Sequence, residues 1–189
     1  MDIYHWILLA AWLAFIVYWI TSARTAKKTL SRGGAWRVQM VARILFIAFF
    51  LLVIQVPALR EFATAFFHYS PPLILKAFGA VCAVVGVAFA ISARRALGSN
   101  WGMPMSVKEN PELVTTGLYA YIRHPIYTGM FVALFGSALV EPVWSVVFVF
   151  ALGYFLYSAK KEEALMQQTF PDTYPAYKKR TKMLIPFVF

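Results

Sequence analysis

Long apolar runs constrain this chain more than any other feature of its sequence. Three of them, Ile3–Ile20, Met40–Leu59 and Pro72–Ile91, have between 18 and 20 residues each. An α-helix needs roughly 20 predominantly apolar residues to cross the hydrocarbon core of a bilayer. Each of these runs therefore predicts a transmembrane helix.

Two shorter apolar runs follow, Ile126–Val140 and Val143–Tyr157, and only Glu141 and Pro142 separate them. Each has 15 residues, which is about 22 Å of helix at 1.5 Å per residue. We interpret residues 126–157 as a helical hairpin whose arms extend beyond the strictly apolar stretch. The second arm is expected to continue out of the membrane as one helix over Val143–Phe170.

The composition agrees with a membrane protein and excludes several other classes. The chain of 189 residues is 61% hydrophobic and 14% charged, against about a half and a quarter in an average soluble domain. These values exclude a disordered chain and an ordinary soluble enzyme. A single cysteine, Cys82, allows neither an intrachain disulfide nor a cysteine metal cluster.

Basic residues are distributed very unevenly between the predicted loops. Fifteen lysines and arginines lie after the first, third and fifth runs: Arg24, Lys27, Lys28, Arg32, Arg37, Arg94, Arg95, Lys108, Arg123, Lys160, Lys161, Lys178, Lys179, Arg180 and Lys182. The other two loops hold little charge beyond Arg60, Glu61 and Glu141. Because positive loops stay in the cytoplasm, this pattern predicts five spans with the N-terminus outside and the C-terminus in the cytoplasm. Anionic lipid accounts for the net charge of +10, so we expect no nucleic-acid partner.

The predicted fold is an all-α integral membrane protein with five transmembrane helices, the last two forming the hairpin. Residues 1–92 would carry three spans and a basic loop. Residues 93–189 would carry a cytoplasmic loop, the hairpin and C-terminal helices. Aromatic residues near the ends of the first run are interpreted as interfacial anchors, namely Trp6, Trp12, Tyr18 and Trp19.

The first candidate site is the sequence Arg123-His124-Pro125, which precedes the fourth apolar run. Proline suits the first turn of a helix, so Arg123 and His124 are predicted at a helix N-terminus. Free N–H groups and the helix dipole attract anions there. A carboxylate or phosphate site is one interpretation, and interfacial side chains that reach lipid headgroups are the other. No cluster of histidine, cysteine and acidic residues accompanies His124, so no metal site is expected.

The C-terminal tail holds the second candidate site. Glu162 and Glu163 follow the fifth run and would suit a cationic group, although a solvated turn paired with nearby lysines explains them equally well. Tyr174 and Tyr177 lie three residues apart, which places both on one face of a short helix. An interfacial aromatic belt is the alternative for these tyrosines.

Residues 93–189 resemble the isoprenylcysteine carboxyl methyltransferase family. The likeness rests on Leu97-Gly98-Ser99-Asn100-Trp101, on the segment from Leu113 to Tyr127 that contains Arg-His-Pro, and on the tail pattern from Glu162-Glu163 to Ile185-Pro186. The resemblance implies an integral membrane enzyme that transfers a methyl group from S-adenosylmethionine, releasing S-adenosylhomocysteine. It implies an acceptor that is a lipid or a prenylated small molecule drawn from the bilayer.

The resemblance also implies which residues bind the cofactor: Val114, Gly117, Leu118, Tyr119, Arg123, His124, Pro125, Tyr127, Glu162, Glu163, Tyr174 and Tyr177. Apolar and aromatic groups would enclose the adenine, and Gly117 would allow close approach of the backbone. Arg123 and His124 would hold the carboxylate, and a glutamate would hold the ammonium. Arg123 and Glu163 are the expected catalytic residues.

One position departs from the family pattern. Members that act on prenylated cysteine usually carry an arginine four residues before the acidic pair, where this chain has Ser158. We therefore expect low activity on a prenylcysteine analogue and, if the shape of the pocket allows it, a gain from Ser158→Arg. A phospholipid N-methyltransferase on the same scaffold is an alternative, and a dinucleotide-dependent reductase or a non-catalytic relative are further ones. The short chain resembles prokaryotic members, which would place it in the inner membrane.

Overall fold

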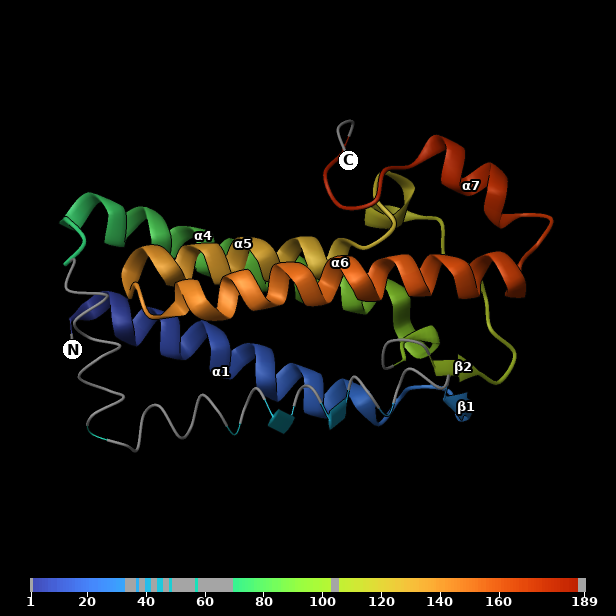
Figure 1. Ribbon diagram of the computed structural model, residues 1–189, viewed down its shortest axis with the longest axis horizontal. Helices are drawn as coiled ribbons and strands as arrows, with labels where there is room; N and C mark the ends of the chain where they lie inside the picture. Colours follow the sequence, from blue (N-terminus) through green and yellow to red (C-terminus); the bar gives the residue numbers. More distant parts are fainter. Residues whose placement is uncertain are drawn as a thin grey trace.

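A computed structural model of the chain describes residues 2–32, 70–102 and 106–186, together with isolated positions between residues 37 and 57. Four helices lie lengthwise beside one another: α1 (Ile3–Ala23), α4 (Leu73–Leu97), α5 (Pro125–Val140) and α6 (Trp144–Thr169) (Figure 1). The short helix α7 (Tyr174–Arg180) lies over one end of α6. The predicted span Met40–Leu59 lies outside the described residues apart from isolated positions.

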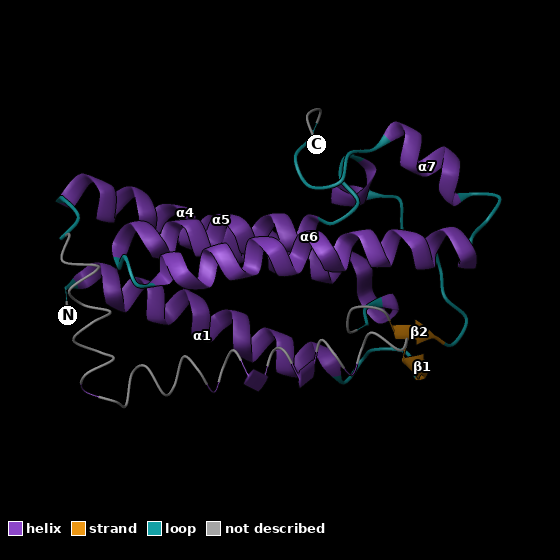
Figure 2. Cartoon of the chain, in the orientation of Figure 1, coloured by secondary structure: helices purple, strands orange, loops and turns teal. Residues whose placement is uncertain are grey.

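Irregular elements gather at the same end as α7 (Figure 2). They are the 3₁₀ turns Gly98–Asn100 and Gly117–Ala120 and the strands β1 (Thr29–Arg32) and β2 (Ser106–Lys108). The two strands pair antiparallel, with Thr29 opposite Lys108. The predicted helical fold is confirmed, and this small ribbon is an addition to it: two extended loop segments that meet side by side satisfy each other's backbone groups.

Local sequence signals explain where the long helices begin and end. Asp2 caps α1, because its carboxylate accepts from the backbone N–H groups of Tyr4 and His5. Pro125 occupies the first turn of α5 as expected. Gly98 ends α4 with a φ of 57°, a left-handed conformation that glycine adopts without steric cost.

Glycines bring α4 and α5 into direct backbone contact. Gly79 faces Gly136, and Gly86 faces Gly129, so the two antiparallel helices share a seam with glycines seven residues apart. A Cβ atom on Gly86 would lie 2.3 Å from the backbone nitrogen of Ala133. Small residues at such a seam allow close van der Waals packing, which is the main attraction between helices in a membrane.

Helix α1 is attached to the other helices by polar contacts at its start and at its middle. Lys76 and His5 both contact the Asp2 carboxylate, at 2.8 and 2.7 Å, and His5 also reaches Glu141 at 3.1 Å. Farther along, the Trp12 indole donates to the Ser137 hydroxyl at 3.0 Å. These contacts connect α1 with the start of α4 and with α5.

The hairpin prediction is confirmed, because α5 ends at Val140 and α6 begins at Trp144. The second arm does continue as one helix to Thr169. Among the described residues, only Ile3–Ala23 and Leu73–Asn100 are both long and apolar enough to cross a membrane by themselves. The count of five spans therefore stays a prediction.

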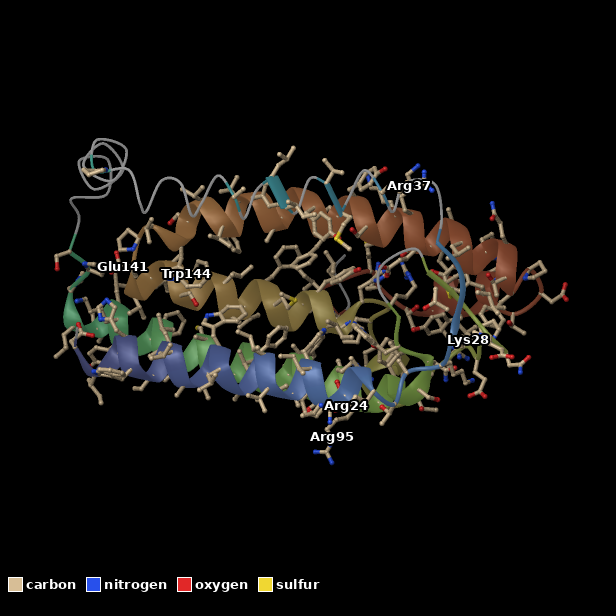
Figure 3. All side chains as sticks on the ribbon, turned by 90° about the horizontal axis from the view of Figure 1, so that it is seen from below. Arg24, Lys28, Arg37, Arg95, Glu141 and Trp144 are labelled. Atoms are coloured by element: carbon tan, nitrogen blue, oxygen red, sulfur yellow. The ribbon has the colours of Figure 1, made fainter. Side chains whose placement is uncertain are left out.

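Several basic side chains lie toward one end of the helix layer. Arg24, Lys28 and Arg95 lie toward one end, whereas Glu141 and Trp144 lie at the other (Figure 3). Helix α7 and the β ribbon lie at this basic end.

Candidate functional site

The C-terminal tail is joined to the segment before α5 by backbone hydrogen bonds. The N–H groups of Arg123 and His124 donate to the carbonyls of Lys182 and Met183 at 2.8 and 3.0 Å, and Lys182 donates back to Tyr121 at 3.2 Å. The sequence contains no periodic pattern that predicts this pairing, because it depends on one isolated bridge between Ile122 and Lys182. It fixes the tail beside the N-terminus of α5.

Arg123 and Glu163 form the buried ion pair at the centre of this region. The Arg123 Nε donates to the Glu163 carboxylate at 2.6 Å, and Arg123 Nη1 donates to the carbonyls of Thr181 and Lys178. Lys178 reaches the other Glu163 oxygen at 2.7 Å. Glu163 is 5% exposed. Both side chains are thus committed to holding the tail on α6.

His124 lies between the two carboxylates of the acidic pair. Its Nδ1 is 3.4 Å from Glu162, and its Nε2 is 3.6 Å from Glu163. Burial by itself would lower the pKa of His124, but the contacts with Glu162 and Glu163 outweigh it and raise the pKa. The Nε2 is buried, and the Glu163 carboxylate is its partner in this ion pair.

The pKa of Glu163 is lowered, whereas that of an isolated buried acid would be raised. Burial would raise the pKa of Glu163, but His124, Lys178 and Arg123 together lower it to about 2. An anionic Glu163 therefore stabilises the fold above its unfolded pKa of 4.5, and this contribution is lost as the pH falls toward 2. The protonated His124 stabilises the fold with the opposite pH dependence. Its stabilising contribution is complete below the unfolded pKa of 6.5, and it is lost as the pH rises through the raised pKa of the folded state.

We expect the melting temperature in detergent to fall on both sides of mildly acidic pH. Glu163→Gln should reduce the fall in melting temperature on the acidic side. His124→Phe, which keeps an aromatic ring in place, should reduce the fall on the alkaline side. Thermal unfolding across a pH series checks both arms. If His124→Phe lost stability at alkaline pH as much as the parent does, His124 would not be the group responsible for that loss.

Glu162 differs from its neighbour because it faces a cavity. Its carboxylate accepts a hydrogen bond from the Tyr127 hydroxyl, and its side chain is 25% exposed. The rings of His124, Tyr127 and Phe155 stack in succession, with centroids 5.5 and 4.7 Å apart. This stack orients the hydroxyl that contacts Glu162.

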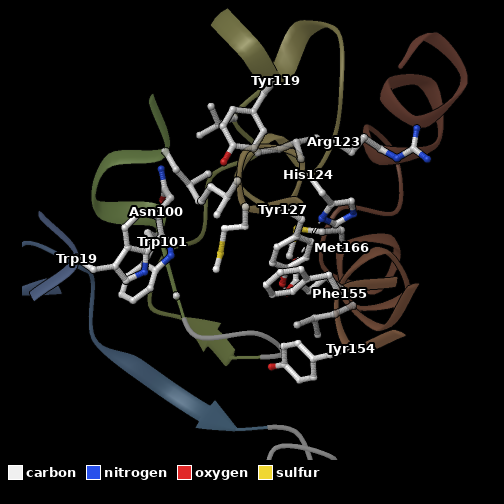
Figure 4. A pocket seen from close by; sticks show the side chains of 18 of the residues that line it. Trp19, Asn100, Trp101, Tyr119, Arg123, His124, Tyr127, Tyr154, Phe155 and Met166 are labelled. Carbon is white, nitrogen blue, oxygen red and sulfur yellow. Dashed lines mark hydrogen bonds and ion pairs between the residues drawn. The ribbon is translucent and has the colours of Figure 1, made fainter. Parts of the chain in front are cut away.

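The cavity measures about 620 Å³ and is lined by residues of α1, α5, α6, the loop after α4 and the tail. Figure 4 shows Trp19, Trp101 and Asn100 on one side of it and the stacked rings on the other. Its polar lining residues are concentrated at the basic end, and its remaining wall is mostly aromatic and aliphatic. A pocket of this size with few polar groups is typical of small-molecule and cofactor sites.

Most of the residues predicted to bind the cofactor converge on this cavity. Those that line it are Val114, Tyr119, Arg123, His124, Tyr127, Glu162, Tyr174 and Tyr177. Gly117, Leu118, Pro125 and Glu163 are not among its lining residues. Gly117 adopts a φ of 60°, so a left-handed turn requires this glycine. The predicted close approach of the cofactor to this glycine stays a prediction.

The two tyrosines of α7 lie on one buried face, as their spacing predicts. Tyr177 donates its hydroxyl to the carbonyl of Tyr119 at 2.8 Å. Burial raises the pKa of Tyr177 to about 12, so the hydroxyl keeps the proton that it donates. These contacts close the cavity on the side of the tail.

Sequence reasoning missed several residues of the cavity. Trp12 and Trp19, interpreted above as interfacial anchors, line it, whereas Trp6 is 55% exposed. Asn100 and Glu112 also line it and share a hydrogen bond of 3.2 Å, with Lys27 bound to both. Of these residues, only Asn100 could have been selected from the sequence, because it belongs to the motif that ends at Trp101.

Ser158 is fully buried and is not among the residues that line the cavity. The gain expected from Ser158→Arg stays a prediction.

Residues 74–173 match the family described as phospholipid methyltransferase. A protein-S-isoprenylcysteine O-methyltransferase from Schizosaccharomyces pombe is 30% identical over 118 residues, which cover 60% of this chain and 49% of that protein. The enzyme of the same name from Dictyostelium discoideum is 28% identical over 176 residues, 89% of this chain and 70% of its own length. The chain thus spans about half the length of the first of these relatives.

A solved structure of the eukaryotic intramembrane Ras methyltransferase ICMT aligns with 84% of this chain and 55% of its own, at a TM-score of 0.54 and 23% identity. That likeness shows a shared fold. The family match covers more than half of the chain, including nearly all of α4, the whole of α5 and α6, and the residues Arg123, His124, Glu162 and Glu163 of the candidate site. The chain therefore belongs to the phospholipid methyltransferase family of membrane proteins.

Proposed function

We propose that the protein transfers a methyl group from S-adenosylmethionine to an acceptor that carries an apolar chain. One observation carries this proposal: a single cavity joins a polar end at Glu162 and His124 to a long wall of aromatic and aliphatic side chains. A polar cofactor and an apolar acceptor would meet where the two parts join.

The residues at the polar end fit the charged groups of this cofactor. Glu162 presents a carboxylate for the ammonium group, and Tyr127 and His124 hold that carboxylate in place. His124 lines the cavity and would provide positive charge near the cofactor carboxylate. Tyr119 and Val114 would enclose the adenine.

The expected roles of Arg123 and Glu163 change accordingly. We assign them to positioning, because their charges are already paired with each other and with the tail. Their ion pair keeps Tyr174 and Tyr177 against the cavity. We further propose that residues 93–189 form the catalytic region, since Asn100, Glu112, Glu162 and the other polar lining residues all come from it.

Methyl transfer makes modest demands on the protein. The cofactor supplies an electrophilic methyl group on a sulfonium, and the acceptor displaces it in line. The chain contributes orientation and exclusion of water. A carboxylate acceptor is already ionised at neutral pH, whereas an amine must first lose a proton.

Removing the charge of Glu162 tests the cofactor assignment. We expect Glu162→Gln to weaken binding of S-adenosylmethionine by about 1.5–3 kcal/mol, the range for hydrogen bonds to charged groups. Calorimetry in detergent measures this loss. Asp172→Asn, at an exposed position beyond α6, is the matched control and should bind like the parent. Equal affinity in Glu162→Gln would place the cofactor elsewhere.

A second acceptor class, a lipid amine, has one specific observation in its favour. Arg123 and His124 are the cationic side chains among the described lining residues, and both already contact Glu162 or Glu163. A carboxylate acceptor would have to compete for them. Incubation with methyl-labelled cofactor and total membrane lipid separates the classes: mild base releases label from a methyl ester but not from an N-methyl group.

We propose that the basic end faces the cytoplasm, with the N-terminus outside and the C-terminus inside, as the positive-inside rule requires. The separation of Arg24, Lys28 and Arg95 from Glu141 supports this orientation. A cysteine at position 141 should react with an impermeant reagent added outside. Reaction from the cytoplasmic side alone would reverse the topology. A prokaryotic inner membrane stays a prediction.

A further inference from the structure

Two tryptophans form the floor of the cavity, at the end farthest from Glu162. Trp12 of α1 and Trp144 of α6 stack with ring centroids 5.8 Å apart and an angle of 3° between their planes. Both line the cavity. The Trp12 indole is held by its hydrogen bond to Ser137, which is fully buried. Trp144 lies near Glu141, at the end of the layer opposite the basic loops (Figure 3).

Helix α6 provides a scale for the depth of the cavity. Glu162 and Trp144 are 18 residues apart on one continuous helix, which corresponds to about 27 Å. Phe155, on which the Tyr127 ring stacks, lies between Glu162 and Trp144 on this helix. Between Phe155 and Trp144 lie about 16 Å of helix, close to half of the roughly 30 Å hydrocarbon core of a bilayer.

The lining of this deeper part suits hydrocarbon. Along α5 and α6 it consists of Met130, Leu134, Val147 and Ala151, and its floor is the tryptophan pair. On the α1 side, Trp19 packs against Trp101 with centroids 6.2 Å apart. An apolar chain can occupy such a wall without burying polar groups that lack hydrogen-bond partners.

We propose that the stacked pair Trp12–Trp144 sets the length of the acceptor's apolar chain. The pair admits one chain of about the depth of a single leaflet and excludes longer chains. This inference rests on the proposed function, in which the polar end of the cavity holds the cofactor. Ser137 acts as a positioning residue, because it fixes the indole of Trp12 without lining the cavity.

The test uses N-acetyl-S-alkylcysteines with a photoreactive diazirine at the end of the chain. Chains of about ten, sixteen and twenty-two carbons are compared, the middle one approximating half a hydrocarbon core. The protein is irradiated in lipid nanodiscs, and labelled residues are located by mass spectrometry. We expect the middle chain to label Trp144 or Val147 and an unlabelled competitor to remove this label. Label on the lipid-exposed Val149, which is 66% exposed, should resist competition.

Two variants should change the depth of the cavity in opposite directions. Trp144→Ala should raise competed labelling by the longest chain at least roughly tenfold, the scale on which apolar pockets discriminate by size. Val147→Trp should exclude the middle chain and retain the shortest. Trp6→Ala, at an exposed position on α1, should behave like the parent. Val147→Trp also decides the question if Trp144→Ala does not fold.

The outcomes separate this inference from the proposed function. Chain-length preferences that are the same in Trp144→Ala, Val147→Trp and the parent would overturn the role of the floor, even if methyl transfer occurs. The expected changes in chain-length preference, observed without methyl transfer to any acceptor, would support the role of the Trp12–Trp144 pair and reject the proposed reaction.

Discussion

Replacing Gly86 by valine is expected to eliminate the folded protein. A Cβ atom at this position would lie 2.3 Å from the backbone nitrogen of Ala133 and 2.6 Å from the carbonyl oxygen of Gly129. Side chains cannot relieve these collisions, because the colliding atoms belong to the backbone of α5. We expect a loss of more than about 3 kcal/mol, beyond the usual cost of overpacking. The measurement is the fraction of protein that elutes as a single species from detergent extracts after mild heating.

Gly153→Ala is the matched control for this seam. Gly153 lies within α6, and a Cβ there would meet nothing within 4 Å. Alanine also has the higher helix propensity, by about 1 kcal/mol, so this variant should be at least as stable as the parent. If Gly86→Val remained as stable as Gly153→Ala, α4 and α5 would not pack along their glycines.

Arg123→Ala is expected to be nearly as damaging, and for a reason that differs from a lost ligand contact. Removing the guanidinium leaves the buried Glu163 carboxylate with only its contacts to Lys178 and His124. It also deprives the tail of the donor to the carbonyls of Thr181 and Lys178. Breaking one partner of a buried pair typically costs 3–5 kcal/mol. We expect a lower melting temperature and rapid proteolytic cleavage between α6 and the C-terminus.

Glu162→Gln is the informative comparison, because it alters the adjacent carboxylate and leaves the ion pair intact. We expect it to keep the parent's resistance to protease and to lose cofactor affinity, whereas Arg123→Ala loses both. Arg123→Lys should recover little, since an ammonium cannot reproduce the separate contacts of Nε and Nη1. Loss of affinity in Arg123→Ala without any change in protease resistance would restore its role as an anion receptor.

Short-range patterns predicted the local structure of this chain well. The hairpin follows from two apolar runs interrupted at Glu141 and Pro142, and the start of α5 follows from Pro125. The buried face of α7 follows from the spacing of Tyr174 and Tyr177. Each of these features depends on residues within a few turns of one another, where helical periodicity and capping chemistry determine the outcome.

The site itself depended on contacts between distant segments. The sequence could not distinguish Glu162 from Glu163, because neighbouring residues on a helix point about 100° apart and only packing decides which direction is buried. Arg123, 40 residues before Glu163, binds it, and that pairing leaves Glu162 to face the cavity.

The apolar residues show the same division between what composition determined and what packing decided. Sequence alone established that this chain places long apolar helices in a membrane, because hydrophobicity adds along a segment without reference to its neighbours. Only the tertiary structure decided which of these helices touch and which aromatic rings face inward. Trp6 and Trp12 lie on the same apolar helix, yet one is 55% exposed and the other lines the cavity, because the Ser137 hydroxyl that holds Trp12 comes from a helix 125 residues away.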